Sequence, residues 1–372
     1  MRNAMKIGII TLKSHTNYGW ILQAYALQMF LTRMGHNVNI IEEYPRLFSY
    51  RYVYWFVKRI VLKIWKNRQL PLFLEEDLKK CSIKPQQFID ENLAICKIKS
   101  FSTLKENDYD AFVVGSDQIW RPRYFSGNIS DAFLGFSKSW NVKRIAYAPS
   151  FGTSDWEYSE KQEATCRELI RQFDAVLVRE ISGVDLCRKY FGVQACHVVD
   201  PTLLLMQEDY TALYKKANTI KSAGTLLTYI LDETPQKYAI VKTLATEMSL
   251  VPFRVNSAIF DYSKSLDERR QPSLETWLRG FADSEFVVTD SFHACVFSII
   301  FHKQFVVIGN KARGLSRIQS LLKKMGLEDR LLSSAWKGCI AELVEIDYKQ
   351  VDDILDKWRN ESIDLLQHAL ND

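Results

Sequence analysis

An apolar run followed by a polar turn occupies Phe286-Val287-Val288-Thr289-Asp290-Ser291-Phe292-His293. The apolar, β-branched start of this stretch predicts a buried parallel strand, and residues 293–301 predict a helix that covers the sheet. Thr289-Asp290-Ser291 is then the turn at the carboxyl end of the strand. Ligands of open α/β sheets bind at such strand ends, where the free N–H groups of a following helix attract anions.

His293 falls in the first turn of this predicted helix. A helix N-terminus disfavours a positive imidazole, so the position suits a histidine that acts as a neutral base and becomes charged when an anion binds. The alternative is that Asp290 or Ser291 only caps the helix and that His293 is a hydrogen-bonded core residue. The local pattern is compatible with both interpretations.

An alternating series of strands and helices surrounds this stretch. Strands are predicted at 225–230, 251–255, 286–288 and 304–308, and helices at 235–248, 273–282 and 293–301. The loop after the last strand carries Lys311, Arg313 and Arg317, which the topology brings near His293. Because guanidinium groups match carboxylate and phosphate oxygens, the loop suits an anionic substrate. The alternative is a basic loop at the start of a helix over 316–325.

The first half of the chain shows the same alternation, with predicted strands at 6–12, 38–41, 110–114, 143–148, 175–178 and 195–198. The economical interpretation is an α/β protein of two Rossmann-like, doubly wound domains facing across a cleft. The predicted domains are residues 1–210 and 211–345, and an amphipathic helix in residues 346–372 crosses back to the first domain. No G-x-G-x-x-G or G-x-x-x-x-G-K-[ST] motif is present, which argues against a dinucleotide site.

Polar or small residues recur where the predicted strands of the first domain end. A doubly wound sheet brings four of them to one edge: Asn17, Ser116, Ser150 and Arg179. Asn17 and Gly19 form either a helix entrance with a turn glycine or a backbone-lined ligand wall. Each residue alone also fits a cap, a turn or an ion pair, but together they predict a site edge.

Residues 46–68 hold seven basic and no acidic residues. On a helix they form a basic face opposite an apolar face, with Tyr54, Trp55 and Trp65 as interfacial anchors. This pattern predicts peripheral contact with an anionic membrane through residues 54–66. The alternative is a helix packed on its own domain with a solvated basic face.

The bulk composition is that of a globular protein, with 372 residues, 47% of them hydrophobic. The net charge of +5 is too small and dispersed for a nucleic-acid binder. Seven cysteines without a C-x-x-C pair argue against a disulfide framework or zinc site, and we expect no metal. The sequence has no apolar run of membrane-spanning length and no signal peptide, so the predicted location is the cytoplasm. The basic segment adds the prediction of peripheral contact with the inner face of the cytoplasmic membrane.

The motifs together resemble the polysaccharide pyruvyl transferase family over nearly the whole chain. They are Asn17-Tyr18-Gly19, Gln23-Ala24-Tyr25-Ala26-Leu27, Val114 to Trp120, Val178-Arg179-Glu180, Asp200-Pro201, Thr289 to His293, and Arg313 to Arg317. The resemblance implies a GT-B-like pair of domains, transfer of pyruvyl from phosphoenolpyruvate to two hydroxyls of a sugar as a cyclic ketal, and no cofactor. It also implies that His293 is the catalytic residue.

Many family members carry arginine two positions before this histidine and glycine directly after it, whereas this chain has Ser291 and Ala294. Arg313, Arg317 or Arg179 is a candidate to replace the missing arginine. The expected donor-binding residues are Asp290, Ser291, Arg313, Ser316, Arg317 and Arg179. The expected acceptor-binding residues are Asn17, Tyr18, Gly19, Ser116, Asp117 and Ser150. The acceptor is a surface-polysaccharide sugar or its lipid-linked oligosaccharide precursor. The alternatives are a GT-B glycosyltransferase that uses a nucleotide sugar and a catalytically silent polysaccharide-assembly partner.

Overall fold

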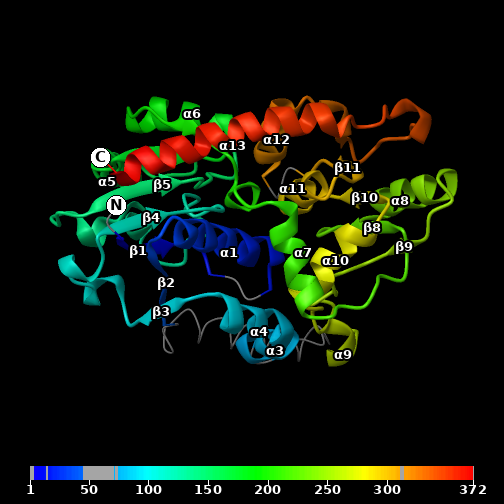
Figure 1. Cartoon of the computed structure of the whole chain (residues 1–372), viewed down its shortest axis with the longest axis horizontal. Helices are drawn as coiled ribbons and strands as arrows, with labels where there is room; N and C mark the ends of the chain where they lie inside the picture. The colour runs from blue at the N-terminus through cyan, green and yellow to red at the C-terminus, as the bar shows by residue number, and fades with distance from the viewer. Residues whose placement is uncertain (1–3, 14–15, 45–70, 72–73, 311–313, 372) are drawn as a thin grey trace.

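The computed structural model describes residues 4–13, 16–44, 71, 74–310 and 314–371. Two parallel sheets lie side by side, and helices cover both faces of each (Figure 1). This confirms the predicted α/β fold of two doubly wound units. The predicted basic helix of residues 46–68, with its membrane contact through residues 54–66, lies outside the described residues, as does Arg313.

Seven strands form the first sheet, in the order β3-β2-β1-β4-β5-β6-β7. Their bounds are β1 (Lys6–Ile10), β2 (Asn37–Glu43), β3 (Ile95–Ile98), β4 (Ala111–Val114), β5 (Lys143–Tyr147), β6 (Ala175–Val178) and β7 (Cys196–His197). Every neighbouring pair is parallel. The chain runs outward from β1 to β3 and returns on the other side of β1 at β4, so the topological switch point lies between β1 and β4.

Five strands form the second sheet, in the order β12-β11-β10-β8-β9. Their bounds are β8 (Leu226–Tyr229), β9 (Pro252–Phe253), β10 (Phe286–Thr289), β11 (Gln304–Ile308) and β12 (Leu331–Leu332). All four pairings are parallel. The switch point of this sheet lies between β8 and β10, and His293 follows β10 by four residues.

The α-helices alternate with these strands. In the first domain they are α1 (Tyr18–Arg33), α3 (Leu74–Cys81), α4 (Ile83–Asn92), α5 (Glu160–Ile170) and α6 (Ile181–Leu186), which continues as a π-helical turn over Cys187–Phe191. The remaining helices are α7 (Gln207–Lys216), α8 (Pro235–Glu247), α9 (Leu266–Arg269), α10 (Leu274–Asp283), α11 (Phe292–Ile300), α12 (Leu315–Met325) and α13 (Tyr348–Asn371). Short 3₁₀ turns fill several of the loops, and no described helix combines the length and apolar character needed to cross a bilayer.

Local sequence explains several of these boundaries. Asn17 caps α1 by accepting a hydrogen bond from the Trp20 N–H (3.3 Å), and Gly35 follows the helix with a left-handed φ of 94°. The predicted strand over residues 251–255 is only two residues long, because Pro252 lacks an N–H group and restricts β9 to a short edge strand. The pattern does not predict β3, since Ile-Cys-Lys-Ile is short and is interrupted by a lysine.

One hydrophobic cluster runs through both domains. Alternate residues of β1 and β5 pack under α1 on one face of the first sheet, and the same cluster continues through α11 into the second sheet. A separate cluster covers the opposite face of the first sheet. Because burying apolar area is the main favourable term in folding, this shared core holds the two sheets in a fixed arrangement.

The last helix crosses back to the first domain, as the sequence predicts (Figure 1). The Trp358 indole donates a hydrogen bond to the carbonyl of His197 (3.1 Å), and the Arg359 guanidinium donates one to the carbonyl of Leu203 (2.6 Å). The Val199 N–H also donates to the hydroxyl of Ser362 (3.1 Å). The division of the chain at residues 210 and 345 stays a prediction.

Candidate active site

A cavity of about 480 Å³ lies where the switch points of the two sheets meet. The first domain contributes the end of β2 and segments after β1, β3 and β4, and the second contributes the loops after β8 and β10 and the first turns of α11 and α12. Ligands of doubly wound sheets bind at these positions, because the strand-end loops diverge there and leave a crevice. The cleft expected from the sequence therefore contains His293, Asp290, Ser291, Arg317, Asn17 and Asp117 in its lining.

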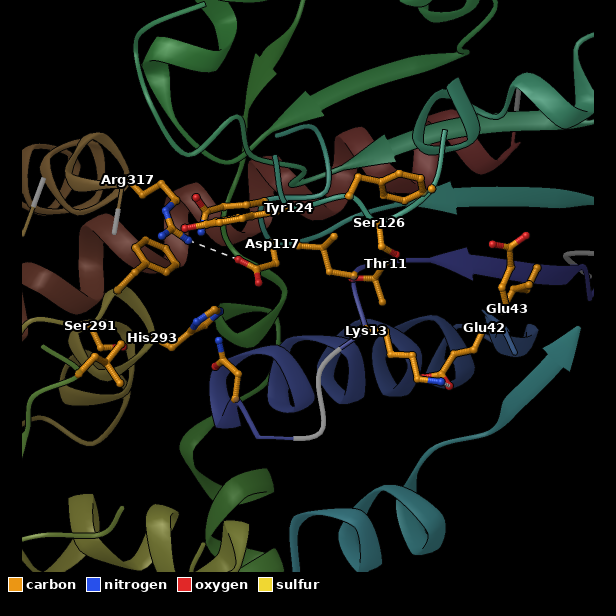
Figure 2. A pocket seen from close by; sticks show the side chains of 18 of the residues that line it. Thr11, Lys13, Glu42, Glu43, Asp117, Tyr124, Ser126, Ser291, His293 and Arg317 are labelled. Atoms are coloured by element: carbon orange, nitrogen blue, oxygen red, sulfur yellow. Dashed lines mark hydrogen bonds and ion pairs between the residues drawn. The ribbon is translucent and has the colours of Figure 1, made fainter. Parts of the chain in front are cut away.

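His293 projects into this cavity from the first turn of α11 (Figure 2). Ser291 caps the helix through its hydroxyl, which accepts a hydrogen bond from the Ala294 N–H (3.5 Å). The histidine is 6% exposed, and its Nε2 atom has no hydrogen-bond partner within the described part of the chain. The nearest charged atom is Oδ2 of Asp200, at 3.7 Å, which is too far for a hydrogen bond. A buried imidazole nitrogen without a partner is available to a ligand or to a proton.

The opposite edge of the imidazole rests on Gly19, in the first turn of α1. A Cβ atom built on Gly19 would lie 2.2 Å from Nδ1 and 2.4 Å from Cγ of His293. Real Cβ atoms do not approach other heavy atoms this closely, so only glycine leaves room for the ring. Asn17, which caps the same helix, lines the cavity beside this contact.

Arg179 holds two carboxylates together below the cavity. It follows β6, and its guanidinium donates to Oδ2 of Asp200 (2.8 Å) and to Oδ1 of Asp117 (3.1 Å). Arg179 and Asp200 are both 2% exposed. Charges that are buried to this extent need partners, and the two acids supply them.

Arg317 reaches the same carboxylate from the second domain. Its Nη1 atom lies 3.3 Å from Oδ1 of Asp117, as the dashed line in Figure 2 marks. The guanidinium carbon atoms of Arg179 and Arg317 lie 4.7 and 5.3 Å from the centre of the Phe292 ring. Cation–π attraction to one ring thus keeps two like charges close together, and Asp117 bridges them across the two domains.

Burial and neighbouring charges shift the pKa values of this cluster. Burial lowers the pKa of Arg317 to about 10, and the charge of Arg179 adds to this effect. Burial alone would raise the pKa of Asp117, but the charges of Arg179, Arg317 and His293 bring it below its usual range. Burial also opposes ionisation of Asp200, yet the pKa of Asp200 falls far below its usual range through His293 and Arg179. Both acids are therefore carboxylates at neutral pH.

These depressed pKa values predict acid-sensitive stability. Each acid binds its proton more weakly in the folded than in the unfolded state, so the stabilisation is present above the unfolded pKa of about 3.9 and is lost as pH falls below it. We expect Asp200→Asn to lower the free energy of unfolding by roughly 3–5 kcal/mol at pH 7, because Arg179 loses a buried partner. The difference from wild type should shrink below about pH 4.

Urea denaturation between pH 7 and pH 3 measures this effect. Asp364→Asn, at an exposed position of α13, is the matched control and should follow the wild-type curve at every pH. A constant difference between Asp200→Asn and wild type down to pH 3 would contradict the linkage.

The carboxylate of Asp290 accepts several hydrogen bonds that connect the loops of the site. Its carboxylate accepts hydrogen bonds from the N–H of Leu231 (2.7 Å), from the N–H of Asp232 (3.2 Å) and from Lys237 Nζ (2.5 Å). The side-chain amide of Asn310 adds a fourth contact at 3.3 Å. The carboxylate thus joins the loops after β8, β10 and β11, and this geometry supports a positioning role rather than direct contact with a donor.

Three of the predicted acceptor-binding residues have side chains that are buried in the protein and do not line the cavity. Ser116 donates its hydroxyl hydrogen to Gln23 Oε1 (2.8 Å), and Ser150 donates to Glu180 Oε1 (2.9 Å). The hydroxyl of Tyr18 lies 2.8 Å from acceptors on Gln271 and Pro272. All three are buried, and the cavity is lined by other residues. Their acceptor-binding role stays a prediction, while their observed contacts fix loops around the site.

The structure also adds residues to which the sequence assigns no role. Asp200 belongs to the Asp-Pro motif that follows β7. Its position at the end of a strand could have identified it as a site residue from the sequence. Phe292 and Lys237 carry no such signal, because an aromatic residue and a lysine in helical segments are ordinary. Ser316, an expected donor-binding residue in the first turn of α12, has a buried hydroxyl without a hydrogen-bond partner within the described ranges, and its donor-binding role stays a prediction.

One solved structure shares the two-domain architecture of this chain. Arabidopsis thaliana UGT89C1 in complex with UDP-L-rhamnose matches with 11% identity and a TM-score of 0.51, covering 98% of each chain. A glycosyltransferase from Rickettsia africae matches with 10% identity and a TM-score of 0.49, covering 99% of this chain and 97% of that chain. The first similarity shows that the fold is GT-B. No curated protein matches this chain.

The family model of the polysaccharide pyruvyl transferases matches residues 17–312. This span begins at the cap of α1 and continues past β11, so it contains Asn17, Asp117, Arg179, Asp200 and His293. A match over most of the chain, together with the GT-B fold, settles the family. The chain belongs to the polysaccharide pyruvyl transferase family.

Proposed function

We propose that this protein transfers the pyruvyl group of phosphoenolpyruvate to a sugar of a surface polysaccharide, or of its lipid-linked precursor, as a cyclic ketal. The observation that carries the proposal is the imidazole of His293. It is buried at the junction of the two domains, has an unpartnered Nε2 atom, and lies beside a cavity that Arg317 also lines. The family match supports transfer of pyruvyl to a polysaccharide.

Several cationic or dipolar groups converge where an anionic donor would bind. The first N–H groups of α11 and α12 have no partners within their own helices, and a helix N-terminus favours negative charge. Ser316 and Arg317 lie in the first turn of α12, and Arg317 adds a guanidinium suited to phosphate or carboxylate. Phosphoenolpyruvate carries one phosphate and one carboxylate, which matches these two helix ends.

Asp117 sets the electrostatic balance of this donor site. Its carboxylate lies within 3.3 Å of a nitrogen atom of both Arg179 and Arg317. An entering phosphate would compete with Asp117 for Arg317, while Arg179 would remain paired with Asp200. Arg317 is thus the best candidate to replace the arginine that many family members carry at the position of Ser291.

The proposed reaction has a simple atom balance. The methylene carbon of phosphoenolpyruvate gains a proton and becomes a methyl group, and the two hydroxyl oxygens of the sugar form two bonds to the central carbon. The bond from that carbon to the phosphate oxygen breaks. Of the two hydroxyl protons, one is balanced by the proton on the new methyl group and the other by the proton on inorganic phosphate.

His293 would move protons in this reaction. An enol ether carbon becomes electrophilic only when its methylene is protonated, and the attacking hydroxyl needs a base. One imidazole can serve either step, and Oδ2 of Asp200 lies 3.7 Å from its Nε2 atom. Preorganised donors around the phosphate would stabilise the departing group inside a cleft that restricts water.

Thermal unfolding with two donors tests the proposal. Only a ligand that binds the native state raises the midpoint, and at a hundred times its dissociation constant it adds about 2.7 kcal/mol. We expect phosphoenolpyruvate to raise the midpoint and UDP-L-rhamnose, the ligand of the UGT89C1 structure, to leave it unchanged. The reverse result would favour a nucleotide-sugar glycosyltransferase, and no release of phosphate with any acceptor would favour a silent assembly partner.

Arg317→Ala should weaken phosphoenolpyruvate binding by a factor of roughly ten or more, since a charge-assisted hydrogen bond contributes about 1.5–3 kcal/mol. Arg317→Lys is the informative companion, because it keeps the charge and loses the fork geometry. Isothermal titration with phosphoenolpyruvate measures both. Unchanged affinity in Arg317→Ala and in Arg313→Ala would remove both residues as replacements for the missing arginine.

A further inference from the structure

The cavity continues beyond the donor end to a second end of different chemistry. Figure 2 shows Arg317, Ser291 and His293 at one end, and Lys13, Glu42 and Glu43 at the other. The second end lies at the carboxyl ends of β1 and β2 in the first domain. A single continuous cavity with two chemically distinct ends suits two substrates that must meet.

Glu42 is the central group of this second end. Its side chain is only 6% exposed, yet it lines the cavity. One carboxylate oxygen, Oε2, lies 3.2 Å from Nζ of Lys13. A carboxylate has about four lone-pair sites, so Glu42 can accept a further hydrogen bond beside this ion pair.

The surroundings of Glu42 are those of a sugar site. Glu43 lies beside it at the end of β2 and accepts a hydrogen bond from the Phe101 N–H (2.9 Å) through one oxygen. Phe101, Phe125 and Ser126 line the same cavity, and one face of the Phe101 ring stacks on the ring of Phe136. Carboxylates accept hydrogen bonds from sugar hydroxyls, while aromatic rings pack on the C–H face of a pyranose.

The charge of this end restricts what it can bind. Glu42 and Glu43 carry two negative charges, and Lys13 supplies one positive charge. A carboxylate or phosphate on the ligand would lie against two acids at close range, where like charges repel strongly in a partly desolvated site. An uncharged sugar unit meets no such penalty.

We propose that Glu42, Glu43, Phe101 and Phe125 form the acceptor subsite and that it takes an uncharged sugar unit rather than a uronic acid or a phosphorylated sugar. The proposal rests on the proposed function, and it names the acceptor class that the same cleft would use. Negative charges of a lipid-linked acceptor would then lie outside this end of the cavity. Glu42 would bind the sugar and orient its hydroxyl pair toward the donor.

A panel of methyl glycosides tests the selectivity. The neutral members are the methyl glycosides of glucose, galactose, mannose and N-acetylglucosamine, and the acidic members are the matching glucuronide and galacturonide. We expect saturation-transfer NMR to show binding of at least one neutral glycoside to the wild-type protein and none of either uronide. Equal or stronger binding of the uronides, or binding of no neutral glycoside, would overturn the proposal.

Three variants separate sugar binding from a structural role of the ion pair. Glu42→Gln should weaken binding of the neutral glycoside by a factor of roughly ten or more, because a charge-assisted hydrogen bond is lost. Lys13→Gln breaks the same ion pair but keeps the carboxylate, so it should retain binding. Glu361→Gln, at an exposed position of α13, is the matched control. If Glu42→Gln and Lys13→Gln lose binding equally, or if neither does, the assignment of Glu42 fails.

Measuring phosphoenolpyruvate binding distinguishes a failure of the acceptor subsite from a failure of the proposed pyruvyl transfer. The midpoint shift with phosphoenolpyruvate should persist in Glu42→Gln, since this residue lies at the end opposite Arg317. Loss of glycoside binding with an intact donor shift supports the acceptor subsite. A wild-type protein that binds neutral glycosides but shows no donor shift would instead reject the proposed function and leave a sugar site in place.

Discussion

Replacing His293 with alanine is expected to lower turnover by a factor on the order of a hundred or more, the usual contribution of a positioned acid or base. The fold should survive, because Nε2 of this buried ring has no hydrogen-bond partner in the described ranges that the substitution would orphan. The remaining cost is that of a small cavity at the domain junction. Phosphate release from phosphoenolpyruvate in the presence of acceptor measures turnover, and circular dichroism with thermal unfolding measures the fold.

His293→Gln refines this experiment. Glutamine keeps a polar side chain of similar reach and cannot exchange a proton near neutral pH, so its turnover should be as low as that of His293→Ala. Donor affinity should stay near the wild-type value in both variants, because we assign donor binding to Arg317 and the helix N-termini. Retained turnover in either variant would remove His293 from the mechanism.

Gly19→Ala is expected to lower turnover by a factor similar to that of His293→Ala, although it removes no charged or titratable side chain. Alanine favours a helix by about 1 kcal/mol over glycine, so the change should support α1 itself. The added Cβ would lie 2.2 Å from Nδ1 of His293 and must displace the imidazole. A displacement of about 1 Å is enough to reduce catalysis strongly.

Gly183→Ala is the matched control for this substitution. It places the same methyl group on a buried helical glycine of α6, where the nearest atoms are at 3.4 Å, an ordinary contact distance. This control should keep both turnover and the unfolding midpoint near wild type. The double variant Gly19→Ala with His293→Ala should be no slower than His293→Ala alone, since both changes act on one imidazole. Wild-type turnover in Gly19→Ala would show that the ring position is not needed.

Ser291 illustrates how the family pattern is adapted in this chain. Its hydroxyl caps α11 where many relatives would carry an arginine, so the position supports the helix that presents His293. Arg317 and Arg179 contact the Phe292 ring and share Asp117, and their replacement of that arginine stays a prediction. The Phe292 side chain thus has a positioning role for both guanidinium groups.

Sequence alone determined the two doubly wound domains, the crossing helix and the location of His293 at a strand end. These features follow from patterns of a few residues, because hydrophobic periodicity sets strands and helices and parallel sheets gather their carboxyl ends at one edge. The same logic predicted that Arg317 would lie near His293, which comes 24 positions before it in the chain, whereas the contact of Arg317 with Asp117 of the first domain was not predicted.

Tertiary structure alone decided which strand-end side chains face the cavity. Ser116 turns inward because Gln23, on α1, supplies an acceptor, and Asp290 is saturated because Lys237 and Asn310 reach it from other loops. Gly19 and His293 are in contact although they are distant in the chain. Glu42 likewise lines the same cavity as His293 although the two residues belong to different domains. The direction of a side chain at a strand end depends on partners brought there by folding, and local periodicity carries no information about them.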